Sequence, residues 1–360
     1  MADQPTIQQL EIQSYGCIRK ARIVLSPLHA LIGPNDSGKS TILRALRMVA
    51  QFAAGVFPDG NKTPFDPMLG ETFGVHISVR YPDGLAYAIR TEAGGALQES
   101  VFLKGEQIVR GGPSRSWNTP GLLRMDGASA EVVSLRDRLT TATMTRFDPD
   151  SLRAPAPLIP EKRGIAFADE RGAGLASVFD AIINRDTESF ARIQDSVRTL
   201  FPSVAKVGLI NVSDTLKKIA ITLSDTESTR VGAEAMSEGL LYYLGFAALK
   251  HVSGSRLFLV EEPENGLHPA RIAEVVRVLR EMSKTNQVVI ATHSPLVVNE
   301  LEGHEVSVVT RSADKGTQAV LLKDVPGFAD ASKVYRPGEF WVSYCDGQQE
   351  EPLLTGTPRR

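Results

Sequence analysis

The chain has 360 residues, with 40 basic and 42 acidic side chains and a formal net charge of −2. Hydrophobic residues make up 42% and charged residues 23%, a balance that supports a buried core in about two domains and excludes global disorder. The near-zero charge excludes a strongly basic nucleic-acid coat protein, and two cysteines exclude a disulfide scaffold or a cysteine-ligated zinc site within one chain.

The distribution of apolar residues bears on where the protein resides. Residues 1–16 lack the basic stretch and apolar run of a secretory signal. No segment approaches the run of about 20 apolar residues that crosses a bilayer. We therefore expect a cytoplasmic protein with no membrane partner.

The first quarter of the chain has a strand–loop–helix pattern. Residues 7–33 alternate between apolar and polar side chains in short stretches, which is typical of strands. A glycine-containing loop follows, and residues 42–52 then place apolar side chains on one helical face. This order is the context that a phosphate-binding loop requires.

The loop itself matches the phosphate-loop pattern G-x-x-x-x-G-K-[ST], from Gly33 to Ser40. Its backbone amides and the start of the following helix are suited to hold phosphate oxygens. We expect Lys39 to bridge the β- and γ-phosphates of ATP and the Ser40 hydroxyl to hold Mg²⁺. The predicted nucleotide-binding residues of this segment are Gly33, Pro34, Asn35, Asp36, Ser37, Gly38, Lys39, Ser40 and Thr41.

The middle of the chain has a less regular pattern of predicted elements. Residues 75–81 and 86–92 are predicted to be paired strands, joined by a turn at 82–84. Residues 131–141 and 174–201 have helical spacing, with a break near Asn184, and strand character returns at 204–212 and 218–225. The pattern then becomes regular, with a helix opened by Ser237, a buried strand at 256–262, an amphipathic helix at 272–279 and a buried strand at 287–293.

Two of these buried strands end in ionisable side chains. Glu261 and Glu262 close the first, and a buried carboxylate at a strand end requires a cation or ligand. We expect Glu261 to reach Mg²⁺ and Glu262 to polarise the attacking water. His293 closes the second strand and is suited to donate a hydrogen bond to the γ-phosphate. The other histidines singled out are expected to be structural: His29, His76, His251 and His304.

These motifs, in this order, resemble those of the ABC-type ATPases, which include transporter heads, structural-maintenance-of-chromosomes proteins and recombination-repair ATPases. The stretches "EEPENGLHP" and "ATHSP" are most similar to the OLD-like and AAA-type ATPases of bacterial operons, many of them antiphage systems. The resemblance covers most of residues 5–325. It implies an α/β P-loop fold with a mixed central sheet flanked by helices, an antiparallel β-lobe and a helical insertion.

The resemblance also implies a head-to-tail homodimer, or a higher homo-oligomer, that traps ATP and Mg²⁺ between subunits. Ser237 and Gly239 would cap the γ-phosphate in trans, although this signature lacks the Leu-Ser-Gly-Gly-Gln form. Asn265, Gly266 and Leu267 would lie in the loop that joins the two sites. The glutamine that senses Mg²⁺ in this family has no assigned position in this chain.

Four segments are predicted along the chain. They are an N-terminal ATPase lobe with Walker A and the β-subdomain (1–105), a helical insertion (106–203), a C-terminal ATPase lobe with signature, Walker B and switch histidine (204–325) and a C-terminal extension (326–360). Only 67 residues follow His293, too few for the Toprim nuclease of OLD proteins. The extension concentrates aromatic residues that either dock a partner or pack back onto the same domain: Tyr335, Phe340, Trp341 and Tyr344.

Four functions remain open on the sequence alone. The leading interpretation is an ATP-hydrolysing switch that controls a separate effector protein, such as a nuclease, plausibly in antiphage defence. The alternative is a DNA-repair ATPase that clamps duplex DNA through basic residues. A transporter head and a nucleotide-binding module without turnover are the other two hypotheses. The basic residues considered for a DNA clamp are Arg19, Lys20, Arg44 and Arg47.

Overall fold

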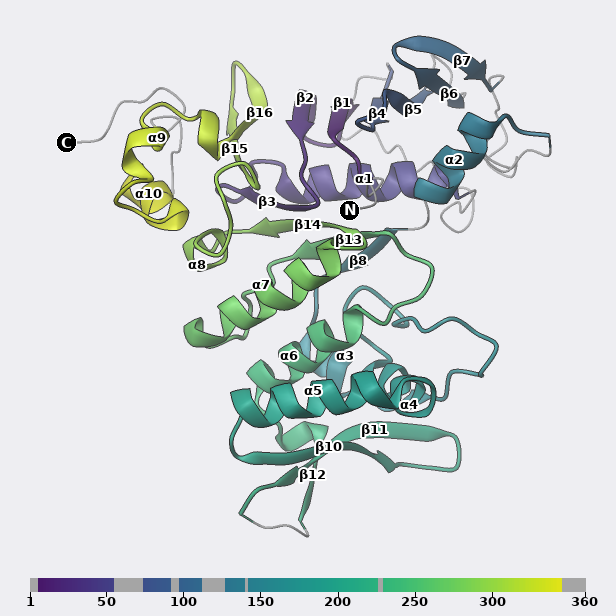
Figure 1. Ribbon diagram of the computed structural model, residues 1–360, viewed down its shortest axis with the longest axis vertical. Helices are drawn as coiled ribbons and strands as arrows, with labels where there is room; N and C mark the ends of the chain where they lie inside the picture. The colour runs from purple at the N-terminus through teal and green to yellow at the C-terminus, as the bar shows by residue number, and fades with distance from the viewer. Residues whose placement is uncertain are drawn as a thin grey trace. The chain divides into compact units, whose positions relative to one another are not determined.

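The computed structural model describes residues 6–54, 74–91, 97–111, 127–139, 142–225 and 229–344. The chain forms two compact units that are interleaved along the sequence (Figure 1). The first unit contains Met1–Thr143, Ser255–Glu262 and Ser283–Arg360, and the second contains Met144–Gly254 and Pro263–Met282. The four predicted segments divide the chain in a different way, and that division stays a prediction.

A six-stranded sheet has the order β16-β15-β3-β14-β13-β8, and the chain leaves the first unit within β8. Strands β13, β14, β3 and β15 pair in parallel, whereas β16 is antiparallel to β15. Every residue of β3, β13 and β14 is buried, which explains their uninterrupted apolar runs. The strands are β3 (Leu28–Ile32), β8 (Ala142–Thr145), β13 (Leu257–Glu261), β14 (Gln287–Thr292), β15 (Val306–Ser312) and β16 (Gly316–Leu321).

A second six-stranded sheet of the first unit is antiparallel, with the order β2-β1-β4-β5-β6-β7. The predicted pairing of β4 with β5 is confirmed, and Gly84 in their turn has a φ of +86°, which favours glycine. Helix α2 (Ala130–Arg138) packs on β5. The strands are β1 (Gln9–Tyr15), β2 (Ile18–Val24), β4 (His76–Arg80), β5 (Leu85–Thr91), β6 (Leu97–Leu103) and β7 (Glu106–Arg110).

Helix α1 (Lys39–Ala53) contacts strands of both sheets, among them β1 and β4 of the antiparallel sheet and β13 and β14 of the parallel one. Because both sheets cover it, the helix is buried on most of its circumference and carries apolar side chains on both covered sides. The predicted apolar face of α1 is buried, and Ala45, Met48 and Phe52 are buried as well.

The second unit has a sheet of order β10-β11-β12, with β9 also pairing to β11. Helix α4 packs on β11 and α5 on β10, and Lys217 Nζ of β11 lies 2.6 Å from Asp180 Oδ1 of α4. The predicted helix break near Asn184 is found at Asp186, whose carboxylate accepts from the Ser189 amide and caps α5. The elements are α3 (Pro149–Arg153), β9 (Ala156–Pro157), α4 (Leu175–Arg185), α5 (Thr187–Leu200), β10 (Val204–Asn211), β11 (Leu216–Leu223), β12 (Arg230–Gly232), η2 (Ala233–Ala235), α6 (Glu238–Leu249) and α7 (Pro269–Ser283).

The end of the described chain is helical, with α8 (Pro295–Val298), η3 (Leu322–Asp324), α9 (Phe328–Ala331) and α10 (Pro337–Tyr344). Phe340 and Trp341 of α10 are buried, and the Phe340 ring lies 5.2 Å from that of Phe328. These two aromatic residues therefore pack back onto the first unit, whereas Tyr335 is 55% exposed.

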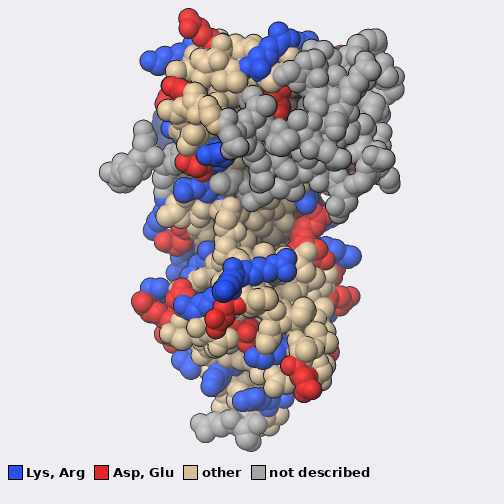
Figure 2. All heavy atoms as spheres, turned by 90° about the vertical axis from the view of Figure 1, so that its right-hand side faces the viewer, with Lys and Arg blue, Asp and Glu red and all other residues tan. Residues whose placement is uncertain are grey.

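The surface carries charges of both signs. Figure 2 shows Lys and Arg interspersed with Asp and Glu over the described part of the face that it presents. Among the helices that the structure describes, none has the length and apolar character needed to cross a membrane.

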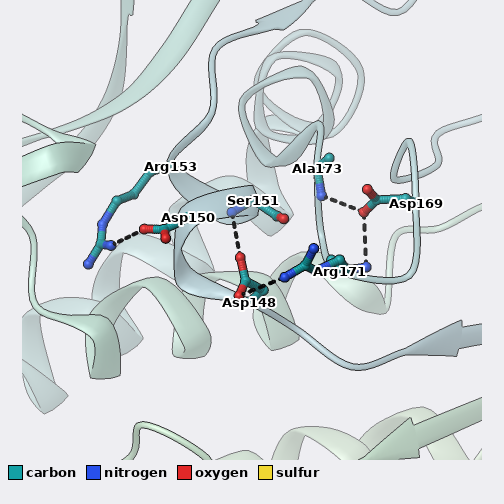
Figure 3. A network of polar contacts seen from close by, with 7 residues as sticks. All are labelled: Asp148, Asp150, Ser151, Arg153, Asp169, Arg171 and Ala173. Carbon is teal, nitrogen blue, oxygen red and sulfur yellow. Dashed lines mark hydrogen bonds and ion pairs between the residues drawn. The ribbon is translucent and has the colours of Figure 1, made fainter.

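A polar network holds the segment that follows β8 (Figure 3). Asp148 caps α3 by accepting from the Ser151 amide at 3.0 Å, and its second oxygen lies 3.2 Å from the Arg171 guanidinium. The bond from the Ser151 amide and the nearby guanidinium lower the pKa of Asp148. Asp169 accepts from the amides of Arg171 and Ala173 and fixes this turn, while the Asp148–Arg171 pair ties it to the start of the segment.

We expect Asp148→Ala to destabilise the protein by about 1 kcal/mol, because the α3 amide loses its cap. In a thermal melt this corresponds to a lower Tm by roughly 2–4 °C. The lowered pKa makes the carboxylate stabilising above about pH 4, so the difference should shrink as the pH falls from 7 to 3. Asp150→Ala is the matched control, because Asp150 makes an exposed pair with Arg153. An equal loss of stability in both variants would contradict the capping role.

Candidate functional site

The predicted phosphate loop leaves the carboxyl end of β3 and enters α1 directly. Gly38 is the residue before the helix, with a φ of +108°, and Asp36 has a φ of +63°. Left-handed residues in such a turn point successive backbone amides into one concavity, which suits an anion. No side chain caps the amino end of α1, so its first amides face this same position.

Close packing explains why the loop begins and ends with glycine. A Cβ atom on Gly33 would lie 1.9 Å from the Val309 carbonyl oxygen of β15. A Cβ atom on Gly38 would come within 3.3 Å of both Thr317 and Cys17, in addition to the strain of its positive φ. The loop is thus seated between the β15–β16 hairpin and the β1–β2 turn.

Two hydroxyl groups also hold the loop in place, one from β16 and one from α1. Thr317 in β16 is buried and donates to the Ser37 carbonyl at 3.0 Å. Thr41 in the first turn of α1 lies 3.3 Å from the Cys17 sulfur. Sequence reasoning missed Thr317, because it lies 280 residues from Ser37 and no local pattern identifies it.

Lys39 is folded over the loop. Its ammonium group donates to the carbonyls of Gly33 at 2.7 Å and Pro34 at 2.6 Å. The side chain is buried at 6% exposure, so its charge is held at the mouth of the amide concavity. An ammonium group in this place supplies the positive charge that a phosphate requires.

The acidic pair lies on the same edge of the parallel sheet. The register aligns Glu261 of β13 with Ala291 of β14, and Thr292 of β14 with Ile32 of β3. The carboxyl ends of these three strands therefore meet at one edge. Neighbouring strands are about 4.8 Å apart, which places Glu261 within roughly 10 Å of the start of the loop.

The backbone of Glu262 is strained. It has a φ of +49°, which is costly for a residue with a Cβ atom, and its amide donates to the Ala291 carbonyl at 2.8 Å. Its carboxylate oxygen lies 3.9 Å from His293 Nε2, and both side chains are partly exposed. The structure thus brings Lys39, Glu261, Glu262 and His293 to the same edge.

The residues present suit a magnesium ion held together with a nucleotide. Within the described ranges, no group of three or more His, Cys, Asp or Glu side chains could hold a metal alone. Mg²⁺ commonly takes one or two protein oxygens and completes its shell with phosphates and water. Ser40, at the second position of α1, and the buried Glu261 carboxylate provide such oxygens.

Ser237 and Gly239 lie in the second unit, at the start of α6. Ser237 accepts from the Leu240 amide at 3.4 Å, an ordinary helix cap. The same residues also line a pocket of about 630 Å³. Gly266 lines it as well, with a φ of +66°, and a Cβ atom there would strike the Tyr242 ring.

Sequence reasoning missed two other residues of this pocket, Phe201 and Arg271. The Arg271 guanidinium lies 5.2 Å from the centre of the Phe201 ring. In the part of the chain that the structure describes, the Arg271 side chain makes no hydrogen bond or ion pair. These residues are far apart in sequence, so only the fold brings them to the Ser237 pocket.

Comparisons with known proteins agree with this architecture. Residues 146–299 match the family described as "AAA domain, putative AbiEii toxin, Type IV TA system", and residues 6–78 match "AAA ATPase domain". The chain is 40% identical over 43 residues to the OLD nuclease of Thermus scotoductus, covering 12% of this chain and 8% of that protein. It is 28% identical over 191 residues to UvrABC system protein A of Brucella abortus, covering 53% and 17%.

These matched segments span less than a fifth of either curated relative. Among solved structures, the SMC head bound to the C-winged helix domain of ScpA has a TM-score of 0.60 at 14% identity, covering 88% of this chain and 98% of that one. The predicted fold class is thereby confirmed as the α/β head of ABC and SMC ATPases. The domain matches and the shared fold together support a P-loop ATPase similar to the OLD-like and repair proteins.

Proposed function

We propose that the chain is a Mg²⁺-dependent ATP-hydrolysing switch that closes as a head-to-tail homodimer and controls a separate effector. One observation carries the proposal. The glycine loop with Lys39, the Glu261–Glu262 pair and His293 all lie at the carboxyl edge of β3, β13 and β14. A phosphate cradle beside a carboxylate and an imidazole is the arrangement that phosphoryl transfer to water needs.

Each residue of the edge then has a defined task. The loop amides and Lys39 hold the β- and γ-phosphates, and Ser40 with Glu261 provides the oxygens for Mg²⁺. The ion supplies neutralisation of the phosphate charge when it is bound. Glu262 accepts a proton from the water that attacks the γ-phosphorus, and the bond to the ADP oxygen breaks. His293 donates a hydrogen bond to the γ-phosphate.

The division into units supports a shared site. Ser237 and Gly239 belong to the second unit, whereas the phosphate loop belongs to the first. The pocket at Ser237 contains the amino end of α6 and the Arg271 guanidinium, both of which favour an anion. In a head-to-tail dimer this pocket would receive the γ-phosphate held by the other copy.

Two comparisons support the proposed control of an effector. The SMC head of similar fold was solved with a bound protein domain, and the matched family description refers to a toxin–antitoxin system. We therefore propose that nucleotide-driven closure exposes or hides a docking surface for a partner, in antiphage defence. Unchanged plaque counts on a host that expresses the chain with its partner gene would remove the defence part.

Glu262→Gln should abolish most turnover while the protein still binds ATP. Loss of a general base lowers the rate by about 10²–10⁴-fold, and the glutamine keeps the size of the side chain. Phosphate release measures the rate, and light scattering with ATP and Mg²⁺ measures assembly. We expect the variant to accumulate as a dimer or larger assembly that ATP promotes.

The control for this experiment is Glu302→Gln, an exposed glutamate that faces His304. It should hydrolyse ATP at the wild-type rate. Turnover by Glu262→Gln at the wild-type rate would exclude Glu262 as the base. Monomers of both proteins in ATP would contradict the shared site for the isolated chain.

Mixing two inactive variants should restore activity if the site is shared. Lys39→Ala lacks the ammonium group that holds the phosphates, and Gly239→Glu places a negative charge in the Ser237 pocket. A mixed dimer contains one site that is intact on both sides. Equal amounts that assort at random should recover about a quarter of the wild-type rate per chain.

Gly239→Ala is the matched control for the mixing experiment. A Cβ atom on Gly239 meets the Gly266 carbonyl oxygen at 3.5 Å, an ordinary contact, so this variant should fold and remain active. A mixture that stays as inactive as its components would argue for sites completed within one chain.

DNA binding is a second candidate, favoured by the match to UvrABC system protein A and by the position of two basic residues. Burial raises the pKa of Tyr15 at the end of β1, and the nearby charges of Arg44 and Arg47 on α1 oppose this shift. Two basic residues of α1 therefore lie close to the end of β1.

An ATP-dependent DNA clamp should bind duplex DNA steeply less well as salt rises. Replacing Lys20, Arg44 and Arg47 with Ala should reduce the salt slope by about one unit for each DNA phosphate that is no longer bound. Fluorescence anisotropy with a labelled duplex measures this. Absence of binding at low salt with ATP present would remove this candidate.

A further inference from the structure

Strand β10 lies at one edge of the small antiparallel sheet in the second unit and pairs with β11 on its other side. Helices α4 and α5 pack on one face of this sheet (Figure 1). Just past β10, the Val212 amide donates to the Leu216 carbonyl at 2.8 Å. Because backbone groups alternate along a strand, the even-numbered residues from 206 to 212 bond toward β11, and the odd-numbered residues point their amides and carbonyls outward.

Two side chains of α5 cap these outward groups in the first half of β10. The Arg198 guanidinium donates to the Ala205 carbonyl at 2.8 Å. The Gln194 side chain accepts from the Val207 amide at 3.0 Å. Another strand could not pair with this half without displacing both caps, so the first half of the edge is protected.

The second half of the edge, from Gly208 to Val212, is open. Within the part of the chain that the structure describes, no group bonds to the outward amides and carbonyls of Leu209 and Asn211. The stretch also contains no charged residue and no proline, the residues that commonly protect a strand edge. The Val212 side chain is 49% exposed. The open stretch is therefore available to a second strand.

The residues of this stretch are complementary to themselves. In an antiparallel pair centred on Ile210, Gly208 of one copy lies opposite Val212 of the other. A Cβ atom on Gly208 would meet nothing within 4 Å, so the exposed Val212 side chain has room above it. The same register brings Lys206 opposite Asp214, and both of these side chains are exposed. Shape and charge thus agree on one register.

We propose that a second copy of this chain pairs with the open stretch, so that two β10 strands run antiparallel and the two small sheets become one. The outward groups of Leu209 in each copy bond to those of Asn211 in the other. The contact lies wholly in the second unit and requires no nucleotide, so it goes beyond the head-to-tail closure proposed above. A chain with two different contacts to itself can assemble beyond a dimer when ATP is present.

An extended segment of a different protein is the competing occupant. Backbone groups alone accept any strand, so they do not distinguish the two. The second copy supplies both the side chain that fills the space above Gly208 and the carboxylate opposite Lys206, whereas an unrelated strand would need to carry both by coincidence. The paired stretch is short, and we therefore expect a reversible dimer rather than a permanent one.

Cysteine cross-linking tests the register. Cys17→Ser and Cys345→Ser first remove the native thiols. The two copies of Ile210 form a non-hydrogen-bonded pair with Cα atoms about 4.5 Å apart, which a disulfide can bridge. We expect Ile210→Cys to give a disulfide-linked dimer in mild oxidant without nucleotide, as a non-reducing gel shows.

A mixture of two variants checks the same register independently. Gly208→Cys and Val212→Cys should link to each other when they are mixed, because these positions lie opposite one another across the pair. Neither variant should link to itself, since its two copies are roughly 14 Å apart along the strands.

Lys206→Cys is the matched control, because it lies on the same strand and the same face as Ile210 and is exposed. In the proposed register its two copies are roughly 27 Å apart, so it should not form a disulfide-linked dimer.

Asn211→Pro removes an outward amide that β11 does not use, and an edge strand tolerates proline at such a position. It should melt cooperatively, as the wild type does, and associate at least about tenfold more weakly. Sedimentation velocity over a range of protein concentrations, without nucleotide, measures this association.

Three results would overturn the inference. Equal linking of Lys206→Cys and Ile210→Cys would show random collision instead of a register. Ile210→Cys that stays unlinked at high protein concentration would remove the contact. Wild-type association of Asn211→Pro would place any dimer elsewhere. The light-scattering experiment with ATP tests the proposed function separately, because these measurements contain no nucleotide.

Discussion

The parallel pairing of β13, β14 and β3 is the constraint on which the rest of the site depends. Parallel strands with matched register end at the same edge, so any residue placed just after each strand is brought to a common location. The loop, the acidic pair and the histidine come from three distant parts of the sequence, and the pairing of the strands brings them together. Burial of the strands on both faces holds this edge rigid, because packed apolar strands have little freedom to slide.

The sequence predicted this edge well because its parts carry local signals. The loop has a fixed spacing of glycine and lysine, and Glu261, Glu262 and His293 each follow a continuous apolar run. The paired strands around Gly84 and the break between α4 and α5 were also predictable, since turn and capping residues act over a few positions. The roles of these side chains stay predictions, because geometry alone does not show a reaction.

Other features could not be predicted, for a physical reason. Thr317, Val309, Phe201 and Arg271 contribute through contacts between residues far apart in the sequence, and no periodicity identifies such partners. The two interleaved units were hidden for a related reason, because two of the four crossings between them lie inside regular elements, within β8 and at the end of α7. Burial of Phe340 and Trp341 assigns these two side chains to packing within the first unit, a point that the aromatic composition alone left open.

The strained backbone of Glu262 lies at a boundary between the two units. Glu262 is the last residue of its segment in the first unit, and Pro263 is the first residue of the next segment in the second. Its φ of +49° is a conformation that the surroundings must enforce. The peptide bond between these residues is one of the places where the chain crosses from unit to unit. Because a proline restricts the backbone of the residue before it, Pro263 in one unit helps to set the direction of the Glu262 carboxylate in the other.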